Sequence, residues 1–261
     1  MNRTIRTVED VLVLLDGYFP LPEARWDGLY ADRSTDRPFF APEPDENLVS
    51  YLDRGLIPAT PGPDHTTDRT TDRAAESGPA PTPLRALDLG CGPGRNAIHL
   101  ASRGFEVDAV DLSTAAVDRA EERAREAGAG AGLRFHRASI FEAGLPHAHY
   151  DLVYDSGCLH HLPPHRRVSY LALLDRVLAP GGHFAVTTFA AGAMGSERPD
   201  EELYRLGALE GGLAFSPEEL RSLFRDLTPL EVRPMAVRAP GSGLFGAPFL
   251  LTALFQRTAS L

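Results

Sequence analysis

The sequence of 261 residues predicts an α/β fold, in which a doubly wound, mostly parallel sheet of seven strands carries helices on both faces. The main observation is that short apolar runs alternate with segments of helix-like apolar spacing from residue 84 onward. The composition agrees, because 43% hydrophobic and 24% charged residues are typical of a globular protein. The length suits one large domain or two small ones.

The strands are predicted where short apolar runs are bounded by polar or turn-forming residues. These runs are residues 84–89, 106–110, 133–138, 150–154, 182–189, 230–237 and 248–256. Helix-like spacing follows at residues 94–103, 114–127, 165–178 and 218–224. A turn containing Gly and Pro near residues 239–246 joins the last two runs, which fits a final hairpin on an otherwise parallel sheet.

A short helical extension is predicted before this domain, in residues 1–57. Residues 8–18 and 47–56 carry apolar side chains at three- and four-residue intervals, which indicates two short helices. Residues 58–83 are rich in Pro, Thr, Asp, Gly and Ser and are expected to form a flexible linker, because such a composition cannot offset the entropy of its own ordering. The main domain is therefore predicted to span residues 84–261.

Charge and composition narrow the class of partner. The 36 acidic and 26 basic residues give a net charge of -10, which repels nucleic acid and anionic membranes and favours a small molecule. Every basic residue is arginine, so lysine Schiff-base and lysine-base chemistry are excluded. No apolar stretch reaches the roughly 20 residues of a membrane span, and the N-terminus lacks the apolar core of a signal peptide, so a cytoplasmic location is expected. Monomer and homodimer both stay open.

A glycine-rich turn directly after the first predicted strand is the strongest local signal. Residues 88–94 read DLGCGPG and open a predicted helix, and glycines let the backbone approach a ligand that a side chain would exclude. Asp111 lies about 20 residues further on, at the end of the next strand, where a carboxylate can accept hydrogen bonds from two ribose hydroxyls. This pairing predicts a nucleoside cofactor.

At these residues the sequence resembles the class I S-adenosylmethionine (SAM)-dependent methyltransferases, in which an acidic residue and Gly-x-Gly-x-Gly follow the first strand. The resemblance covers residues 84–189 and includes YDLV at 150–153 and LAPGG at 178–182. It implies a Rossmann-like fold, SAM as cofactor with S-adenosylhomocysteine (SAH) as product, no metal, and methyl transfer to an S, N or O atom of a small molecule, with specialised metabolism as the expected setting. A narrower likeness to thiopurine and thiol/halide methyltransferases rests on residues 155–161 (DSGCLHH) and the aromatic N-terminal segment.

The resemblance implies a role for individual residues of this sequence. Residues that follow the first four strands would hold the cofactor: Asp88, Gly90, Cys91, Gly92, Gly94, Asp111, Leu112, Ser139, Ile140 and Asp155. Within this set the glycines would line the methionine part, Asp88 would lie near its amino group, and Ser139 would stand where the family usually has an Asp facing adenine. The narrower likeness implies a lid and acceptor site formed by Trp26, Tyr30, Phe39, Phe40, Arg167 and Tyr170.

Catalytic roles are assigned to His160, His161 and Asp155, at the edge where parallel sheets bind ligands. Either imidazole could be a general base because it titrates near neutral pH. Alternatively, one His caps the next helix, Asp155 merely ends its strand, and Arg167 and Tyr170 pack or face solvent. Residues 190–212 either close over a substrate or form a loose connection.

Other interpretations stay open at this point. Gly92, Gly94 and Ala97 fit a dinucleotide-binding turn, although Asp88 would then bring negative charge near a pyrophosphate. The fold could also bind SAM without catalysis, or use SAM for a rearrangement or cyclisation. Cys91 and Cys158 are expected to be free thiols, because their spacing to the histidines matches no common zinc motif.

Overall fold

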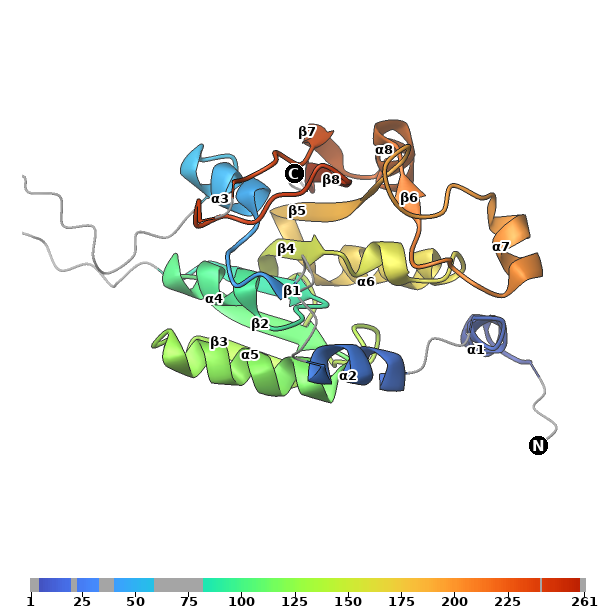
Figure 1. Ribbon diagram of the computed structural model, residues 1–261, viewed down its shortest axis with the longest axis horizontal. Coiled ribbons are helices and arrows are strands. Elements are labelled where there is room, and N and C mark those ends of the chain that lie inside the picture. The colour runs from blue at the N-terminus through green and yellow to red at the C-terminus, as the bar shows by residue number, and fades with distance from the viewer. Residues whose placement is uncertain (1–4, 20–22, 33–39, 59–81, 240, 259–261) are drawn as a thin grey trace, which may run out of the picture.

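The computed structural model describes residues 5–19, 23–32, 40–58, 82–239 and 241–258, which form one sheet with helices on both faces (Figure 1). In this part of the chain the sheet has eight strands. Seven follow the order β3-β2-β1-β4-β5-β8-β7, and the two-residue β6 (Ala214–Phe215) pairs with β5. The seven predicted strands are therefore confirmed and β6 is an addition, too short to be recognised from its sequence.

Five strands run parallel through the centre of the sheet: β1 (Arg85–Leu89), β2 (Glu106–Asp111), β3 (Leu133–Arg137), β4 (Tyr150–Ser156) and β5 (Leu178–Ala190). The chain leaves β3 at one edge and returns to β4 beside β1. The crossover direction thus reverses between β1 and β4, and open α/β sheets bind their ligands at such a point.

The last two strands form the predicted hairpin. β7 (Thr228–Pro234) pairs antiparallel with β8 (Leu250–Gln256), and β8 pairs antiparallel with β5. The connection between them, residues 235–249, returns to the carboxyl edge of the parallel strands, where Phe245 donates its backbone N–H to the carbonyl oxygen of Pro44.

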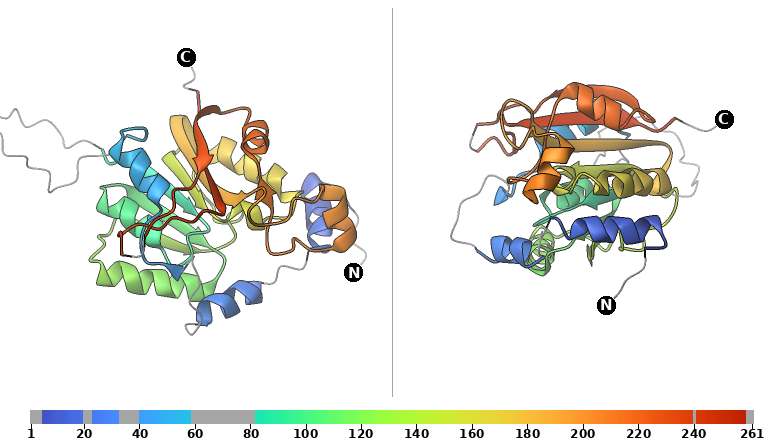
Figure 2. Two further views of the ribbon diagram at one scale, coloured as in Figure 1. Left: turned by 45° about the horizontal axis from the view of Figure 1, so that its top comes forward. Right: turned by 90° about the vertical axis from the view of Figure 1, so that its right-hand side faces the viewer.

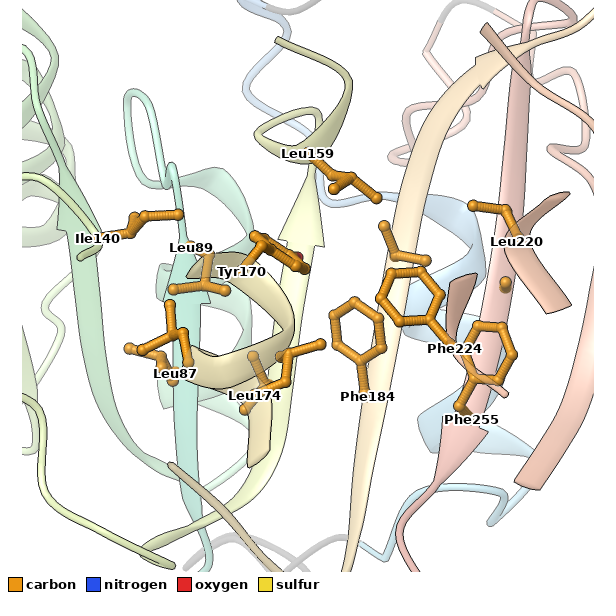
Figure 3. Packing of buried hydrophobic residues seen from close by; sticks show 14 of the residues in the cluster. Leu87, Leu89, Ile140, Leu159, Tyr170, Leu174, Phe184, Leu220, Phe224 and Phe255 are labelled. Atoms are coloured by element: carbon orange, nitrogen blue, oxygen red, sulfur yellow. The ribbon is translucent and has the colours of Figure 1, made fainter. Parts of the chain in front are cut away.

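Helices cover both faces because alternate strand residues are apolar on both sides. Leu87 and Leu89 of β1 pack in the cluster of α6 (Arg166–Val177) and α8 (Pro217–Leu223), whose side chains Figure 3 shows beside the sheet. Ala86 of β1 packs instead with α3 (Glu46–Asp53) and α4 (Arg95–Ser102). Successive side chains of a strand point to opposite faces, which explains this division.

The helix termini follow capping chemistry. α5 (Thr114–Glu126) begins after Ser113, whose side chain accepts a hydrogen bond from the amide of Ala116. α8 begins with a capping box between Ser216 and Glu219. None of the described helices combines the length and apolar character that crossing a bilayer requires.

The N-terminal segment contributes three helices in its described residues. α1 (Val8–Asp16) and α3 match the two predicted helices, and α3 shares the core of the sheet because Leu48 and Tyr51 are fully buried. α2 (Glu23–Ala31) was not predicted. Residues 59–81, most of the expected linker, and Phe39 lie outside the described residues.

Residues 190–212 are partly helical. They include α7 (Asp200–Leu206), which lies beside α1 (Figure 2), with the rings of Tyr18 and Tyr204 6.3 Å apart between centroids. The N-terminal helix α1 thus packs against the segment that follows β5.

A separate short 3-10 helix, η2 (Leu159–His161), follows β4.

Candidate active site

A cavity of about 1130 Å³ lies at the carboxyl edge of the sheet. Its walls include residues that end or follow the five parallel strands: Gly90, Asp111, Ser139, Ile140, Ser156, Gly157, Cys158, Thr187 and Phe189. Small-molecule sites usually measure roughly 300–1,000 Å³, so this cavity is slightly larger than a typical ligand site.

The glycine loop after β1 requires glycine for two reasons. Gly90 and Gly92 have φ of +66° and +51°, the left-handed region that side chains disfavour. A Cβ at Gly90 would also lie 2.8 Å from the Cβ of Cys158, and one at Gly92 would lie 3.0 Å from the hydroxyl of Tyr30. The loop is therefore in close contact with both the β4 loop and the N-terminal segment.

Asp111 lies on the cavity wall at the end of β2 and organises the loop. Its Oδ2 accepts a hydrogen bond from the Gly92 amide and its Oδ1 accepts one from the Ser113 amide, both at 2.8 Å. Burial raises the pKa of this carboxyl group above its ordinary value. Leu112, Ser139 and Ile140 also line the cavity.

The unpredicted helix α2 covers this edge of the sheet and supplies Trp26 and Tyr30 to the cavity wall. Asp27 fixes α2 to the start of α5, because its Oδ1 accepts hydrogen bonds from the Ser113 hydroxyl at 2.6 Å and the Ala115 amide at 3.2 Å. Phe40, the other described aromatic residue of the expected lid, lies against Tyr30 with ring centroids 5.6 Å apart.

Both candidate histidines line the cavity; His160 is buried, His161 is partly buried, and the surroundings of each make it a weak base. His160 stacks on Phe189 at 3.8 Å between centroids, and its Nδ1 accepts the Phe189 backbone N–H at 3.2 Å. Burial lowers the pKa of His160 well below its ordinary value. The ring of His161 meets Trp26 edge-on at 4.8 Å, and burial, assisted by the nearby Arg25, lowers the pKa of His161 to about 4.

Eight of the predicted residues that the structure describes do not line the cavity: Phe40, Asp88, Cys91, Gly92, Gly94, Asp155, Arg167 and Tyr170. Asp155 lies beneath it, where its carboxylate accepts hydrogen bonds from the amides of residues 157–159 and, at 2.6 Å, from the Tyr170 hydroxyl. Burial raises the pKa of Asp155 to about 6. Arg167 forms an ion pair with Asp200 at 2.9 Å. The structure therefore places Asp155 and Tyr170 as supports of the β4 loop and Arg167 as a link to α7.

Two predicted cofactor residues lie behind the glycine loop. Asp88 is buried, its Oδ2 has no hydrogen-bond partner among the described residues, and burial raises its pKa well above the ordinary value. Cys91 is also buried. Cys91 and Cys158 are both free thiols, and the described part of the chain holds no group of three or more side chains suited to a metal ion.

Sequence reasoning missed several residues of the cavity. Arg95 follows the glycine loop directly, so its position was a usable signal. Thr187 of β5 lines the cavity. Phe245 and Phe249, in the connection between β7 and β8, and Leu250, the first residue of β8, line it as well. These residues come from elements whose position depends on the folded sheet.

Comparison with known families resolves the class of this site. Residues 86–182 match the model of the family described as "Methyltransferase domain". These residues form a class I SAM-dependent methyltransferase domain. The match contains the glycine loop, Asp111 and both histidines, and it favours this interpretation over a dinucleotide-binding turn.

Curated relatives share this methyltransferase region. The chain is 36% identical over 127 residues to 27-O-demethylrifamycin SV methyltransferase of Amycolatopsis mediterranei, a match that covers 48% of this chain and 46% of that protein. It is 40% identical over 103 residues to an uncharacterized methyltransferase of Mycobacterium bovis, covering 40% and 49%. The chain thus spans about half the length of the curated relatives it matches.

Solved structures share the fold over nearly the whole chain. One, described under "Conversion of a Disulfide Bond into a Thioacetal Group during Echinomycin Biosynthesis", has a TM-score of 0.62 at 20% identity and covers 92% of this chain and 94% of that chain. Another is 1,6-didemethyltoxoflavin-N1-methyltransferase of Burkholderia thailandensis, with a TM-score of 0.56 at 20% identity and coverage of 99% and 93%. At this identity the likeness shows the architecture of the methyltransferase domain and its flanking elements.

Proposed function

We propose that the chain transfers the methyl group of SAM to a sulfur, nitrogen or oxygen atom of a small molecule. The observation that carries this proposal is the cavity itself, which joins the glycine loop and Asp111 to an aromatic wall at β5 and the final hairpin. Donor and acceptor sites that share one cavity satisfy the requirement of direct transfer, in which the reacting atoms must lie roughly 3–3.5 Å apart.

The residues present fit SAM as the bound cofactor. Asp111 keeps lone pairs for ribose hydroxyls beyond the two amides that it holds, since a carboxylate can accept about four hydrogen bonds. Leu112 and Ile140 offer apolar surface to an adenine, and Ser139 offers a hydroxyl. Asp88 lies behind the glycine loop, and its buried Oδ2 has no hydrogen-bond partner among the described residues. Bound SAM supplies an activated methyl group on a sulfonium.

The acceptor side of the cavity supports a flat, apolar acceptor body. A row of aromatic rings lines it, in which Phe189 lies 5.8 Å from His161 and 6.4 Å from Phe249 between centroids. Trp26 extends the row through its contact with His161. Aromatic rings arranged in this way favour stacked or edge-on contacts with another ring.

The printed names of similar proteins support an acceptor from specialised metabolism. One relative is named for a demethylrifamycin, and one structure was solved with 1,6-didemethyltoxoflavin and SAH bound. We propose that this chain acts on the same class of acceptor, a small molecule of specialised metabolism. We do not propose that it acts on these particular compounds.

The chain's own contribution to the reaction is to position the acceptor and to exclude water. Trp26 and Tyr30 of α2 close one side of the cavity, and positioning alone can supply roughly 7–11 kcal/mol of the barrier. His160 and His161 are neutral at pH 7 and weak as bases. We therefore place thiols, which ionise near about pH 8.5, and heteroaromatic nitrogens ahead of unactivated alcohols.

The experiment uses methyl-labelled SAM with a panel of aromatic thiols, heteroaromatic amines and phenols. The proposal expects a labelled product and an equal amount of SAH, and the Phe249→Ala variant should lose rate for aromatic acceptors more than for small aliphatic ones. SAM binding without turnover on any acceptor would favour a noncatalytic protein. Conversion of an acceptor with SAM unchanged would favour rearrangement or cyclisation.

A further inference from the structure

A buried carboxylate of the N-terminal segment holds the connection between β7 and β8. Glu46, the first residue of α3, is 1% exposed and is not part of the cavity wall. Its Oε1 accepts hydrogen bonds from Nη1 of Arg233 at 2.6 Å and from the backbone N–H of Ala236 at 2.7 Å, and its Oε2 accepts one from Nη2 of Arg233 at 3.1 Å. Nη2 of Arg238 lies 3.6 Å from the same Oε2. Both oxygens of Glu46 are therefore held by the end of β7 and the start of the connection.

The backbone of the same residue pairs with the far part of the connection. The N–H of Glu46 donates to the carbonyl oxygen of Phe245 at 2.9 Å, and the N–H of Phe245 donates to the carbonyl oxygen of Pro44 at 2.8 Å. The connection also closes on itself at Gly246, where a Cβ would overlap the carbonyl oxygen of Ala236. Glu46 thus clamps the connection at two points, through its side chain at Ala236 and through its backbone at Phe245.

The clamped connection carries two aromatic residues of the cavity wall, Phe245 and Phe249. Both pack against a small buried cluster that includes Met235 and Leu250, whose backbones are joined by a hydrogen bond of 2.8 Å. The ring of Phe249 lies 6.4 Å from that of Phe189 between centroids, so it continues the aromatic wall from β5. The side chain that clamps this part of the wall therefore lies outside the cavity.

The chemistry of the clamp favours a role in geometry. A buried ion pair adds little to stability on balance, because the cost of removing two charges from water offsets their attraction, and such pairs can instead select one arrangement of the chain. The bidentate contact of Arg233 with Glu46 defines both distance and direction. Irregular connections on a rigid scaffold commonly carry binding residues. The clamp therefore fixes a part of the cavity wall that lies beyond residues 86–182, the region of the family match.

We propose that Glu46 is a positioning residue that sets acceptor specificity, because it holds Phe245 and Phe249 as a surface for a flat ring. The inference rests on the proposed function, which places the acceptor against this wall. Glu46 takes no part in methyl transfer itself. Release of the connection would let the two rings shift, and an aromatic acceptor would then lose stacked or edge-on contacts that a saturated ring of the same size does not make.

The test measures acceptor preference with two thiols, phenylmethanethiol and cyclohexylmethanethiol, which differ in whether the ring is flat and aromatic. Each is titrated into SAH-loaded protein, and the emission of Trp26, the only tryptophan and part of the cavity wall, reports binding. The preference is the ratio of the two dissociation constants. We expect wild type to prefer phenylmethanethiol and Glu46→Gln to lower that preference by about threefold or more, since an aromatic contact is worth about that factor. Calorimetry should show that Glu46→Gln binds SAH like wild type.

Arg257→Met is the matched control for a lost ion pair on the same hairpin. Arg257 follows β8 at the end remote from the cavity, and its Nη2 lies 3.0 Å from Oδ1 of Asp175. This variant should lower the free energy of unfolding and keep the wild-type preference. The comparison separates positioning of the wall from general destabilisation of the hairpin.

Two further variants keep the test usable if Glu46→Gln does not fold. Arg233→Lys keeps the charge and loses the two-pronged contact, so it should lower the preference in the same direction. The double variant Glu46→Gln with Arg233→Met also removes the cation that Glu46→Gln alone leaves without its main partner. It should lower the preference no further than Glu46→Gln does, because both changes break one clamp.

The inference is overturned if folded Glu46→Gln keeps the wild-type preference, if it weakens binding of both thiols equally, or if Arg257→Met lowers the preference as much. A wild-type chain that binds SAH and shows no preference for phenylmethanethiol overturns it as well, and leaves the proposed methyl transfer standing. Failure of the wild-type chain to bind SAH would instead overturn the proposed function.

Discussion

Oδ2 of Asp111 accepts a hydrogen bond from the backbone N–H of Gly92 at 2.8 Å, so the end of β2 and the glycine loop after β1 form one unit. The other carboxylate oxygen holds the amide of Ser113, which caps α5. One acidic side chain thus sets the loop conformation and the start of a helix, and it still presents acceptor sites to the cavity.

Asp111→Ala should weaken SAH binding by about 1.5–3 kcal/mol, because hydrogen bonds to a charged group are lost. Calorimetric titration of the variant measures this. Asp118→Ala on the exposed face of α5, where Asp118 pairs with Arg137, is the control and should bind like wild type. Equal affinity of the folded Asp111→Ala variant and wild type would place the ribose elsewhere.

Gly94→Ala should destabilise the chain more than Gly128→Ala. Both glycines have positive φ, +80° and +67°, which costs an alanine about 1–2 kcal/mol. A Cβ at Gly94 would in addition lie 3.0 Å from the Cβ of Ala120 and 3.2 Å from the Phe135 ring, whereas a Cβ at Gly128 would meet nothing within 4 Å. Urea denaturation compares the two. Equal losses would show that the loop does not need its close contact with α5.

Trp26 is the only tryptophan of the chain, so its fluorescence reports on the ring of His161 beside it. Because the pKa of His161 is lowered to about 4, the imidazole stays neutral far below its ordinary value of 6.5. Emission should therefore be constant from about pH 8 to about pH 5.5. A step centred near 6.5 that disappears in His161→Phe would mean that His161 titrates normally and can serve as a base.

Asp155 should make stability depend on pH in a defined direction. Its pKa is about 6 in the folded chain against an ordinary 3.8, so the native state binds more protons than the unfolded state between these values. The free energy of unfolding of wild type, minus that of Asp155→Asn, should fall as pH rises from about 4 to about 6, by up to about 3 kcal/mol. Urea titrations across that range measure the difference. A constant difference would show that burial does not raise this pKa.

The sequence predicts the central sheet well because its signal is local. Residues 106–110 read EVDAV, with three apolar side chains between Gly104 and Asp111, and they form β2 over nearly the same residues. The helix α2 has no such signal, since Gly28 interrupts it and its polar and aromatic residues alternate around it. It is held by Asp27 on Ser113, a contact made across the fold.

The candidate site was predictable where it follows the glycine loop and not where it depends on distant partners. Asp111, Ser139 and Ile140 lie on the cavity wall because each follows a predicted strand. Asp155 also ends a strand, but the loop turns back at Gly157, with φ of +104°, and directs three amides at its carboxylate. The pairing of Arg95 with Asp45 joins segments that are far apart in the sequence, so no local pattern indicates it.

The central claim is that the carboxyl edge of this sheet holds an adenosyl sulfonium between the glycine loop and Asp111. A crystal structure of the chain grown with SAH tests it most directly. The account predicts the ribose hydroxyls on the Asp111 carboxylate, adenine between Leu112 and Ile140, and the thioether facing the aromatic wall at Phe189. An SAH molecule bound elsewhere, or a dinucleotide pyrophosphate on the glycine loop in competition with SAH, would contradict it.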